Sequence, residues 1–229
     1  MQIQTINKAI RLIVAYHGSP NNFEQFDYKN LGKNGSVHGY GFYFTDDFDT
    51  ASGYKGDSGK VYETYIRIEQ PLSIDQITIN KAALKKLIRG IDQNEITAVD
   101  EPGHWFLSNY ADVDSYGVNK AVEAAANALL KYNNSDVEMI SDIISTSGKE
   151  VELVYRIVKS ELGYDGIITK SEPDNQGRSS NIYIPFLPEQ IKSINNRGSF
   201  DPDNPNMLFQ TTASIDTPEF KRWFKDSKT

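Results

Sequence analysis

The sequence predicts a single α+β domain, and three observations lead to that fold class. Strand-like segments lie near both ends of the chain, helix-like segments fill its middle, and the two kinds do not alternate as they would in a βαβ series. The length of 229 residues suits one generous domain. The longest apolar run is far shorter than the roughly 20 residues of a membrane span, and the N-terminus shows no signal-peptide core.

Short-range patterns predict the N-terminal elements. The apolar, β-branched run at 11–17 predicts a buried strand that ends at Gly18-Ser19-Pro20. A short aromatic strand is expected over 39–45. A helix is expected over 46–54, because its acidic start suits the positive end of a helix dipole. Residues 61–68 alternate between apolar and polar types, as a half-buried strand does.

Helices are predicted where apolar residues recur every three or four positions, which occurs at 82–91, 119–132 and 151–162. Strand character returns at 164–169 and 181–186. The chain thus has a helical middle of about 80–163 between two groups of strands.

Composition excludes several kinds of chemistry. The chain has 24 basic and 31 acidic residues and a net charge of −7, which argues against a dedicated binder of nucleic acid or anionic membrane. The lack of cysteine excludes disulfides, thiolate zinc sites and cysteine nucleophiles. The three histidines (His17, His38 and His104) are too few for a His-rich centre, so no metal is expected. Aromatic, hydroxyl and carboxylate groups are left to carry the chemistry.

A His-Gly-Ser sequence ends the first predicted strand. Gly18 lets a ligand approach bare backbone N–H and C=O groups, and the side chains of His17 and Ser19 can hydrogen-bond a ribose or an amide. A turn in which His17 satisfies nearby backbone groups would explain the same residues. Taken alone, the motif favours the turn.

Two tyrosines, Tyr43 on the aromatic strand and Tyr54 at the end of the next helix, can face each other across a slot. Two such faces would hold a flat ring by stacking, each contributing about 0.5–1.5 kcal/mol beyond area burial. Ordinary core packing of both rings is the alternative. The pair Gly39-x-Gly41 precedes a strand and not a helix, so a phosphate loop is not expected there.

Together these motifs resemble the NAD-binding half of ADP-ribosyltransferases of the diphtheria-toxin and poly(ADP-ribose)-polymerase type. More specifically, they resemble the ADP-ribosyltransferase-like domain of phage and prophage polyvalent proteins. The resemblance runs from about Leu12 to Gln210 and rests on segments 16–20, 39–45, 51–54, 163–168, 186–193 and 196–206. It implies a domain at 1–210 with two small splayed sheets around an NAD cleft and a helical insertion at about 80–163.

The resemblance also implies NAD as the substrate and gives each group a role. Gly18 would bond the nicotinamide amide through its backbone, and His17 would hold a ribose hydroxyl. Tyr43 and Tyr54 would stack on the nicotinamide, with Ser19 as a nearby polar contact. These groups are expected to converge on one crevice.

The sequence departs from the polymerase-type pattern at two positions. Ala51 replaces a serine that contacts the nicotinamide amide. Ile182, preceded by Asn181, replaces a glutamate that steadies positive charge on the ribose, which isoleucine cannot do electrostatically. The expected reaction is therefore mono-transfer, with the acceptor's own group supplying the missing carboxylate or base. The alternatives are a register shift that brings in Asn181, Glu172 or Glu189, an NAD glycohydrolase, or a silent NAD-binding module.

The expected partners are NAD and an unidentified acceptor, which the acidic charge predicts to be a protein more than a nucleic acid, and no membrane is expected. The expected location is the cytoplasm, that of a bacterial host if the protein is phage-encoded.

The helical middle is interpreted as a structural cap over one sheet face, with an acceptor-recognising lid as the alternative. Residues 211–229 resemble the start of the segment that follows this domain in polyvalent proteins, which predicts a linker or tail within a larger protein. A short helix is expected there from Pro218.

Overall fold

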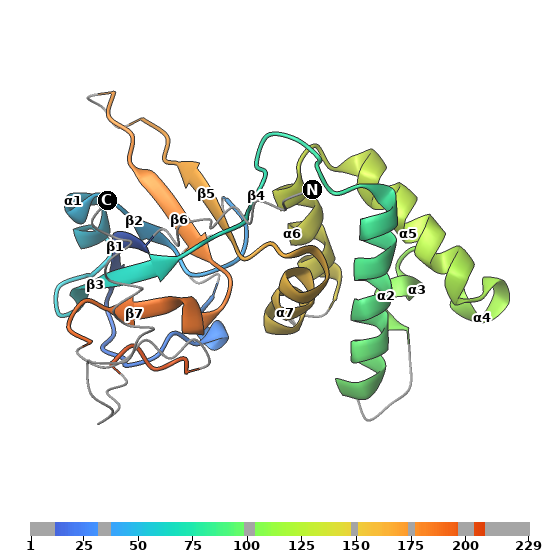
Figure 1. Cartoon of the computed structure of the whole chain (residues 1–229), viewed down its shortest axis with the longest axis horizontal. Coiled ribbons are helices and arrows are strands. Elements are labelled where there is room, and N and C mark those ends of the chain that lie inside the picture. The colour runs from blue at the N-terminus through green and yellow to red at the C-terminus, as the bar shows by residue number, and fades with distance from the viewer. Residues whose placement is uncertain are drawn as a thin grey trace, which may run out of the picture.

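The computed structural model describes residues 12–31, 38–98, 104–147, 151–173, 177–196 and 204–208. In this part of the chain, seven strands form one sheet in the order β4-β5-β6-β2-β1-β3-β7. The strands are β1 (Leu12–Ser19), β2 (Phe44–Thr45), β3 (Lys60–Arg67), β4 (Pro71–Leu72), β5 (Gly166–Lys170), β6 (Asn181–Pro185) and β7 (Ile191–Ser193). The pairing of β4 with β5 is parallel and the other pairings are antiparallel. Figure 1 shows the sheet on one side of the molecule and most of the helices on the other.

The single sheet corrects the expectation of two splayed sheets. Its two halves, β4-β5-β6 and β1-β3-β7, are joined by the two-residue strand β2. Thr45 pairs with Tyr16 of β1, and Phe44 and Thr45 pair with Tyr183 and Ile182 of β6. The sheet is continuous because β2 pairs on both of its edges, although the junction is only one pair wide toward β1.

The predicted aromatic strand is shorter than expected because two glycines interrupt it. Gly39 has a φ of +102° and Gly41 a φ of +147°, and neither is a strand conformation. A Cβ built on Gly41 would lie 2.3 Å from Cγ2 of Ile184, and one on Gly39 would lie 3.0 Å from Cδ1 of Ile167. These glycines allow the chain to pass close to β5 and β6.

Seven α-helices lie in the described residues: α1 (Phe48–Ser52), α2 (Lys81–Ala98), α3 (Trp105–Ser108), α4 (Val113–Tyr116), α5 (Val118–Tyr132), α6 (Asp136–Thr146) and α7 (Val151–Leu162). The structure confirms the helices expected at α2, α5 and α7. Two short 3-10 helices, η1 (Tyr28–Asn30) and η2 (Pro188–Gln190), complete the set. No helix of the described ranges combines the length and apolar character that crossing a membrane requires. The tail at 211–229, with the helix predicted from Pro218, lies outside the described residues.

Helix α6 was not expected, although the sequence carries its start signal. Ser135 accepts a hydrogen bond from the backbone N–H of Glu138 at 3.2 Å, and the Glu138 carboxylate accepts one from the N–H of Asn134 at 2.7 Å. A serine followed three residues later by glutamate is a common helix N-terminal pattern.

Two hydrophobic clusters bury the two halves of the sheet. The helical cluster joins α2–α7 to the β4-β5-β6 half through Leu72, Ile167, Ile184 and Phe186. Tyr155 of α7 stacks on Phe186 with ring centroids 3.9 Å apart. The sheet cluster holds Ala15, Phe26, Phe42, Phe44, Tyr62, Ile66, Ile68, Ile191 and Met207. The helical middle packs on one half of the sheet, as a structural cap requires, and a role in recognising an acceptor stays a prediction.

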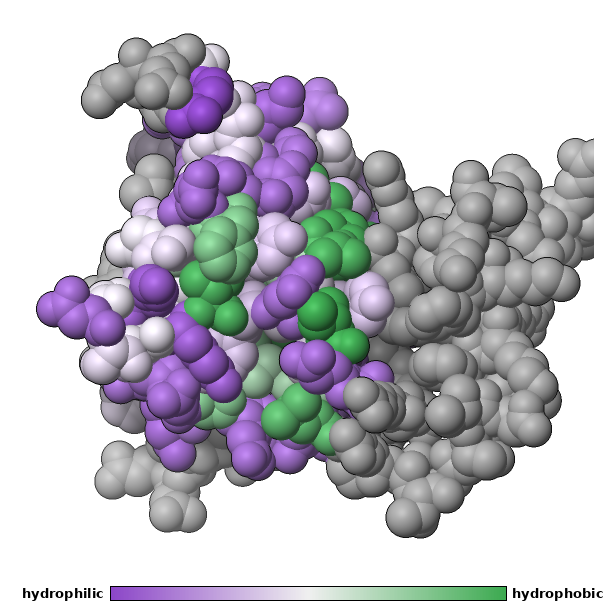
Figure 2. Space-filling model, turned by 90° about the vertical axis from the view of Figure 1, so that its left-hand side faces the viewer, coloured by the Kyte–Doolittle hydropathy of each residue, from purple (hydrophilic) through white to green (hydrophobic). Residues whose placement is uncertain are grey.

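The end of the molecule that carries α1 has a mixed surface. Figure 2 views this end, and the apolar residues of its described part form small groups separated by hydrophilic residues. No large continuous apolar patch is visible on the described part of this face.

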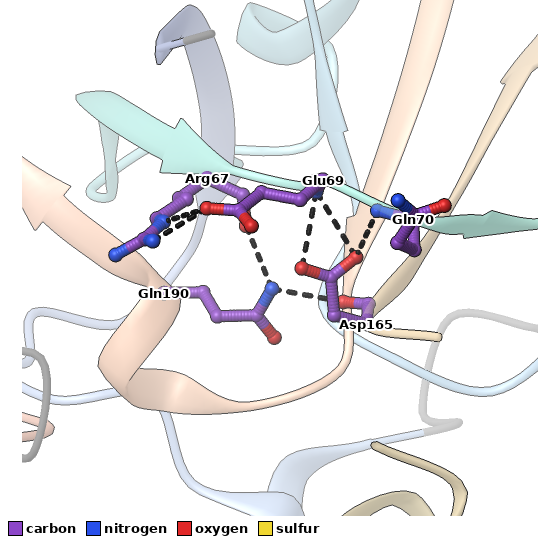
Figure 3. A network of polar contacts seen from close by, with 5 residues as sticks. All are labelled: Arg67, Glu69, Gln70, Asp165 and Gln190. Atoms are coloured by element: carbon purple, nitrogen blue, oxygen red, sulfur yellow. Dashed lines mark hydrogen bonds and ion pairs between the residues drawn. The ribbon is translucent and has the colours of Figure 1, made fainter. Parts of the chain in front are cut away.

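A polar network connects the link between β3 and β4 to the start of β5 and to η2 (Figure 3). The Asp165 carboxylate accepts hydrogen bonds from the backbone N–H of Glu69 at 3.0 Å and of Gln70 at 2.8 Å. Gln190 Nε2 donates to the carbonyl oxygens of Arg67 at 2.6 Å and of Asp165 at 2.8 Å. The buried Asp165 side chain therefore supplies the acceptor for the N–H groups of Glu69 and Gln70, and the Gln190 amide supplies the donor for the two carbonyl oxygens.

Replacing Asp165 with alanine should lower the free energy of unfolding by about 1–3 kcal/mol, because two backbone N–H groups would lose their charged acceptor. Denaturant unfolding measures the change. The matched control is Asp57→Ala, at an exposed position, which should stay within about 0.5 kcal/mol of wild type. Equal losses in the two variants would contradict a structural role for the Asp165 network.

Candidate functional site

Helix α1 lies directly against the end of β1, and Gly18 makes this contact possible. A Cβ built on Gly18 would lie 1.8 Å from the carbonyl oxygen of Ala51 and 3.1 Å from Cβ of Tyr54. No side chain fits in that space. The buried Ala51 also accepts the backbone N–H of Tyr54 through the same carbonyl at 3.1 Å. Gly18 therefore determines how closely Ala51 and Tyr54 approach the strand.

The start of α1 is capped by the second of two consecutive aspartates. The Asp47 carboxylate accepts the backbone N–H of Thr50 at 3.1 Å and also the Thr50 hydroxyl. These hydrogen bonds from Thr50 lower the pKa of Asp47. The preceding residue, Asp46, takes no part in the cap and points to β6 instead.

The His17 ring lies on the other side of β1 from α1, in contact with Phe26, Phe44 and Tyr62. Its Nδ1 lies 2.8 Å from the backbone oxygen of Tyr43. A carbonyl oxygen can only accept, so Nδ1 carries the proton. Burial lowers the pKa of His17, which keeps the ring neutral at pH 7.

The second ring nitrogen of His17, Nε2, is consequently a lone-pair acceptor. In the described part of the chain, Nε2 has no hydrogen-bond partner and is not completely buried. A neutral imidazole with this tautomer can accept a hydrogen bond from a hydroxyl group such as that of a ribose.

The backbone next to His17 has a partner strand on one side. Gly18 pairs with Val61 of β3, whereas the ladder between β1 and β2 consists of Tyr16 with Thr45. Within the described ranges, the edge of β1 that faces β2 is thus unpaired at Gly18. Such an edge offers the bare backbone groups that recognition of an amide requires.

The two tyrosines of the predicted slot differ in exposure. The Tyr43 ring is half buried, and its hydroxyl donates to the Gly39 oxygen at 2.6 Å and accepts from the His38 N–H at 3.1 Å. Burial raises the pKa of Tyr43. Tyr54 is 59% exposed. No ring contact joins Tyr43 to Tyr54 in the described structure, and Tyr43 packs against the helical cluster. The expected convergence of the two rings on one crevice, and their stacking on a ligand, stay predictions.

The register of β6 decides which residue takes the place of the polymerase-type glutamate. Phe44, whose ring contacts His17, pairs with Tyr183 of β6. Because side chains alternate along a strand, Asn181 lies on the same face of the sheet as Tyr183 and His17. Ile182 lies on the opposite face, where it packs against the helical cluster. The structure therefore brings Asn181, and not Ile182, to the face of His17, while any catalytic role of either residue stays a prediction.

The remaining candidates have local partners or lie in loops. Ser19 is buried and its hydroxyl oxygen accepts the N–H of Asn21 at 3.1 Å. Glu189 pairs with Arg156 at 2.8 Å, and Glu172 is exposed in the loop after β5.

His104 stands at the start of α3, where its Nδ1 lies 2.7 Å from the buried carboxylate of Asp92. This contact gives His104 a partner within the helical part of the molecule. Among the described residues, no group of three or more histidine or acidic side chains is arranged to hold a metal ion.

A family model described as ADP-ribosyltransferase in polyvalent proteins matches residues 8–98. Residues 8–98 are thus similar to this ADP-ribosyltransferase family. The match confirms the resemblance, and it covers β1 to α2, hence His17, Gly18, Tyr43 and Tyr54. No curated protein and no solved structure matches the chain. Members of the ADP-ribosyltransferase family use NAD as substrate. The match supports ADP-ribosyltransferase activity in general.

Gly18→Ala should destabilise the protein by about 1–3 kcal/mol, because the added methyl group would force α1 away from β1. Denaturant unfolding measures this loss. Gly53→Ala is the matched control, because Gly53 has helical backbone angles (φ −62°, ψ −24°) and should change stability by less than about 1 kcal/mol. A Gly18→Ala variant as stable as the control would show that the close contact is not required.

Proposed function

We propose that this chain is a mono-ADP-ribosyltransferase, which displaces nicotinamide from NAD and transfers ADP-ribose to a macromolecular acceptor. One observation carries the proposal: the stretch that matches the ADP-ribosyltransferase family is the stretch in which Gly18 holds α1 and Tyr54 against one side of β1 while the ring of His17 projects from the other side. The acceptor would be a protein more than a nucleic acid, because the chain carries a net charge of −7.

Each group of the site has chemistry that fits a part of NAD. The unpaired edge at Gly18 would bond the carboxamide of nicotinamide, and the faces of Tyr43 and Tyr54 would stack on its ring. The neutral His17 would accept a hydrogen bond from a ribose hydroxyl through Nε2. With Ala51 next to Gly18, the amide would be recognised mainly by backbone groups.

Ile182, at the position of the polymerase-type glutamate, supports transfer of a single ADP-ribose. Chain elongation requires a base that activates a ribose hydroxyl of the growing chain, and Ile182 cannot supply one. Binding NAD in a reactive geometry still lowers the barrier to nicotinamide release, because orientation alone contributes several kcal/mol.

The second candidate function is an NAD-binding module without turnover, which the apolar Ile182 favours. The proposal further places the domain in the cytoplasm, within a larger polyvalent protein and in a bacterial host if it is phage-encoded. Water as the acceptor would make the same site an NAD glycohydrolase.

The decisive experiment incubates the protein with NAD labelled in its adenylate part and with whole-cell lysate. Wild type should release nicotinamide and label a protease-sensitive product. His17→Ala and Tyr54→Ala should lose label transfer, because a ribose contact or one face of the stacking slot is removed. Tyr132→Ala is the control, since Tyr132 is an exposed residue of α5 outside the site and should retain transfer.

The other outcomes identify the alternatives. Free ADP-ribose without a labelled product would indicate a glycohydrolase. NAD binding by calorimetry without nicotinamide release would indicate a silent module. Retained transfer in both site variants would remove the proposed site, and a nuclease-sensitive product would reverse the choice of acceptor.

A further inference from the structure

The end of β2 carries an exposed carboxylate that the helix cap does not use. Asp46 accepts the backbone N–H of Asn181 at 2.9 Å through Oδ1, and its Oδ2 accepts the side-chain amide of Asn181. The Asp46 N–H donates in turn to the carbonyl oxygen of Asn181 at 3.3 Å. The carboxylate therefore has a defined position between β2 and β6, although Asp46 is exposed.

The Asp46 carboxylate lies on the same side of the sheet as the His17 ring. Asn181, to which it is bound, shares the face of Tyr183 and Phe44, and Phe44 contacts His17 with ring centroids 5.3 Å apart. Asp46 follows Phe44 by two residues on the strand that lies between β1 and β6. An anionic group thus lies on the face of the sheet from which the His17 ring projects, two residues along the chain from Phe44.

We propose that Asp46 is the carboxylate that stabilises the reacting ribose, with Asn181 as its positioning residue. This inference rests on the proposed function. When the bond between ribose C1′ and the nicotinamide nitrogen breaks, its electron pair stays on the nitrogen and nicotinamide leaves as a neutral molecule. The positive charge passes to C1′ and the ring oxygen of the ribose. The nucleophile of the acceptor then forms the new bond to C1′ and releases its proton to solvent.

A fixed carboxylate lowers the energy of such an oxocarbenium-like transition state, because negative charge is already in place where positive charge develops. Asn181 occupies one lone pair on each oxygen of Asp46 and leaves the others available to face the ribose. The amide of Asn181 carries no charge, so its contribution is to hold Asp46. The apolar Ile182 is then compatible with turnover, because the charge comes from the neighbouring strand.

The test is Asp46→Asn, which keeps the size and the shape of the side chain but removes its charge. The rate constant kcat for nicotinamide release should fall about 100-fold, while the dissociation constant of NAD measured by calorimetry stays that of wild type. The matched control is Asp49→Asn, an exposed acidic residue of α1, which should release nicotinamide at the wild-type rate.

Asn181→Ala tests the positioning role. It should lower kcat with KM and the unfolding midpoint unchanged. In the Asp46→Asn/Asn181→Ala double variant, the loss should equal that of Asp46→Asn alone, because Asn181 acts through Asp46. Additive losses in the double variant would overturn the positioning role.

Failure of the inference and failure of the proposed function give different results. If wild type releases nicotinamide and Asp46→Asn does so at the same rate, the role of Asp46 is overturned and the proposed function stands. If wild type binds NAD and releases no nicotinamide, the proposed function fails, and this inference fails with it.

Discussion

The contact between Gly18 and the backbone of Ala51 is the constraint on which the site depends. It brings α1 within van der Waals distance of β1, so that Tyr54 lies above one side of the strand while His17 projects from the other side. Adjacent residues of a strand point to opposite faces, and one His-Gly pair can therefore serve two parts of a ligand. Two other features complete the site: the bond of His17 Nδ1 to the Tyr43 oxygen makes Nε2 an acceptor, and the short ladder between β1 and β2 leaves Gly18 unpaired on that edge.

The sheet separates packing from chemistry. Its β4-β5-β6 half is covered by the helical body, with Tyr155 stacked on Phe186, and the Asp165 network ties this half to the end of β3. The residues of the candidate site lie around β1 and β2, where the two halves meet. Because β2 is only two residues long, it pairs with β1 and β6 over a short distance. The backbone of β1 at Gly18 and the side chain of Asn181 on β6 are therefore not covered by further strand pairing with β2.

The family match and the structure inform different parts of the site. The match extends over residues 8–98, which carry the groups that would bind nicotinamide and ribose. The glutamate position of the polymerase-type pattern, where this chain has Ile182, lies beyond it on β6, and there only the strand register gives information. That register places Ile182 against the helical cluster and joins Asn181 to Asp46, so an apolar residue in the pattern does not by itself remove negative charge from this face.

The sequence alone determined the elements whose signal is local. Periodicity predicted α2, α5 and α7, alternation predicted β3, and the motifs around His17 and Tyr43 gave the resemblance that the family match over residues 8–98 supports. It could have revealed α6 as well, through Ser135 and Glu138. Only the tertiary structure decided that the strands form one sheet, that Gly39 and Gly41 interrupt a strand to clear β5 and β6, and that Asn181 lies on the same face of the sheet as His17. These features depend on pairing between strands more than a hundred positions apart, and a shift of one residue in that register would exchange the two faces.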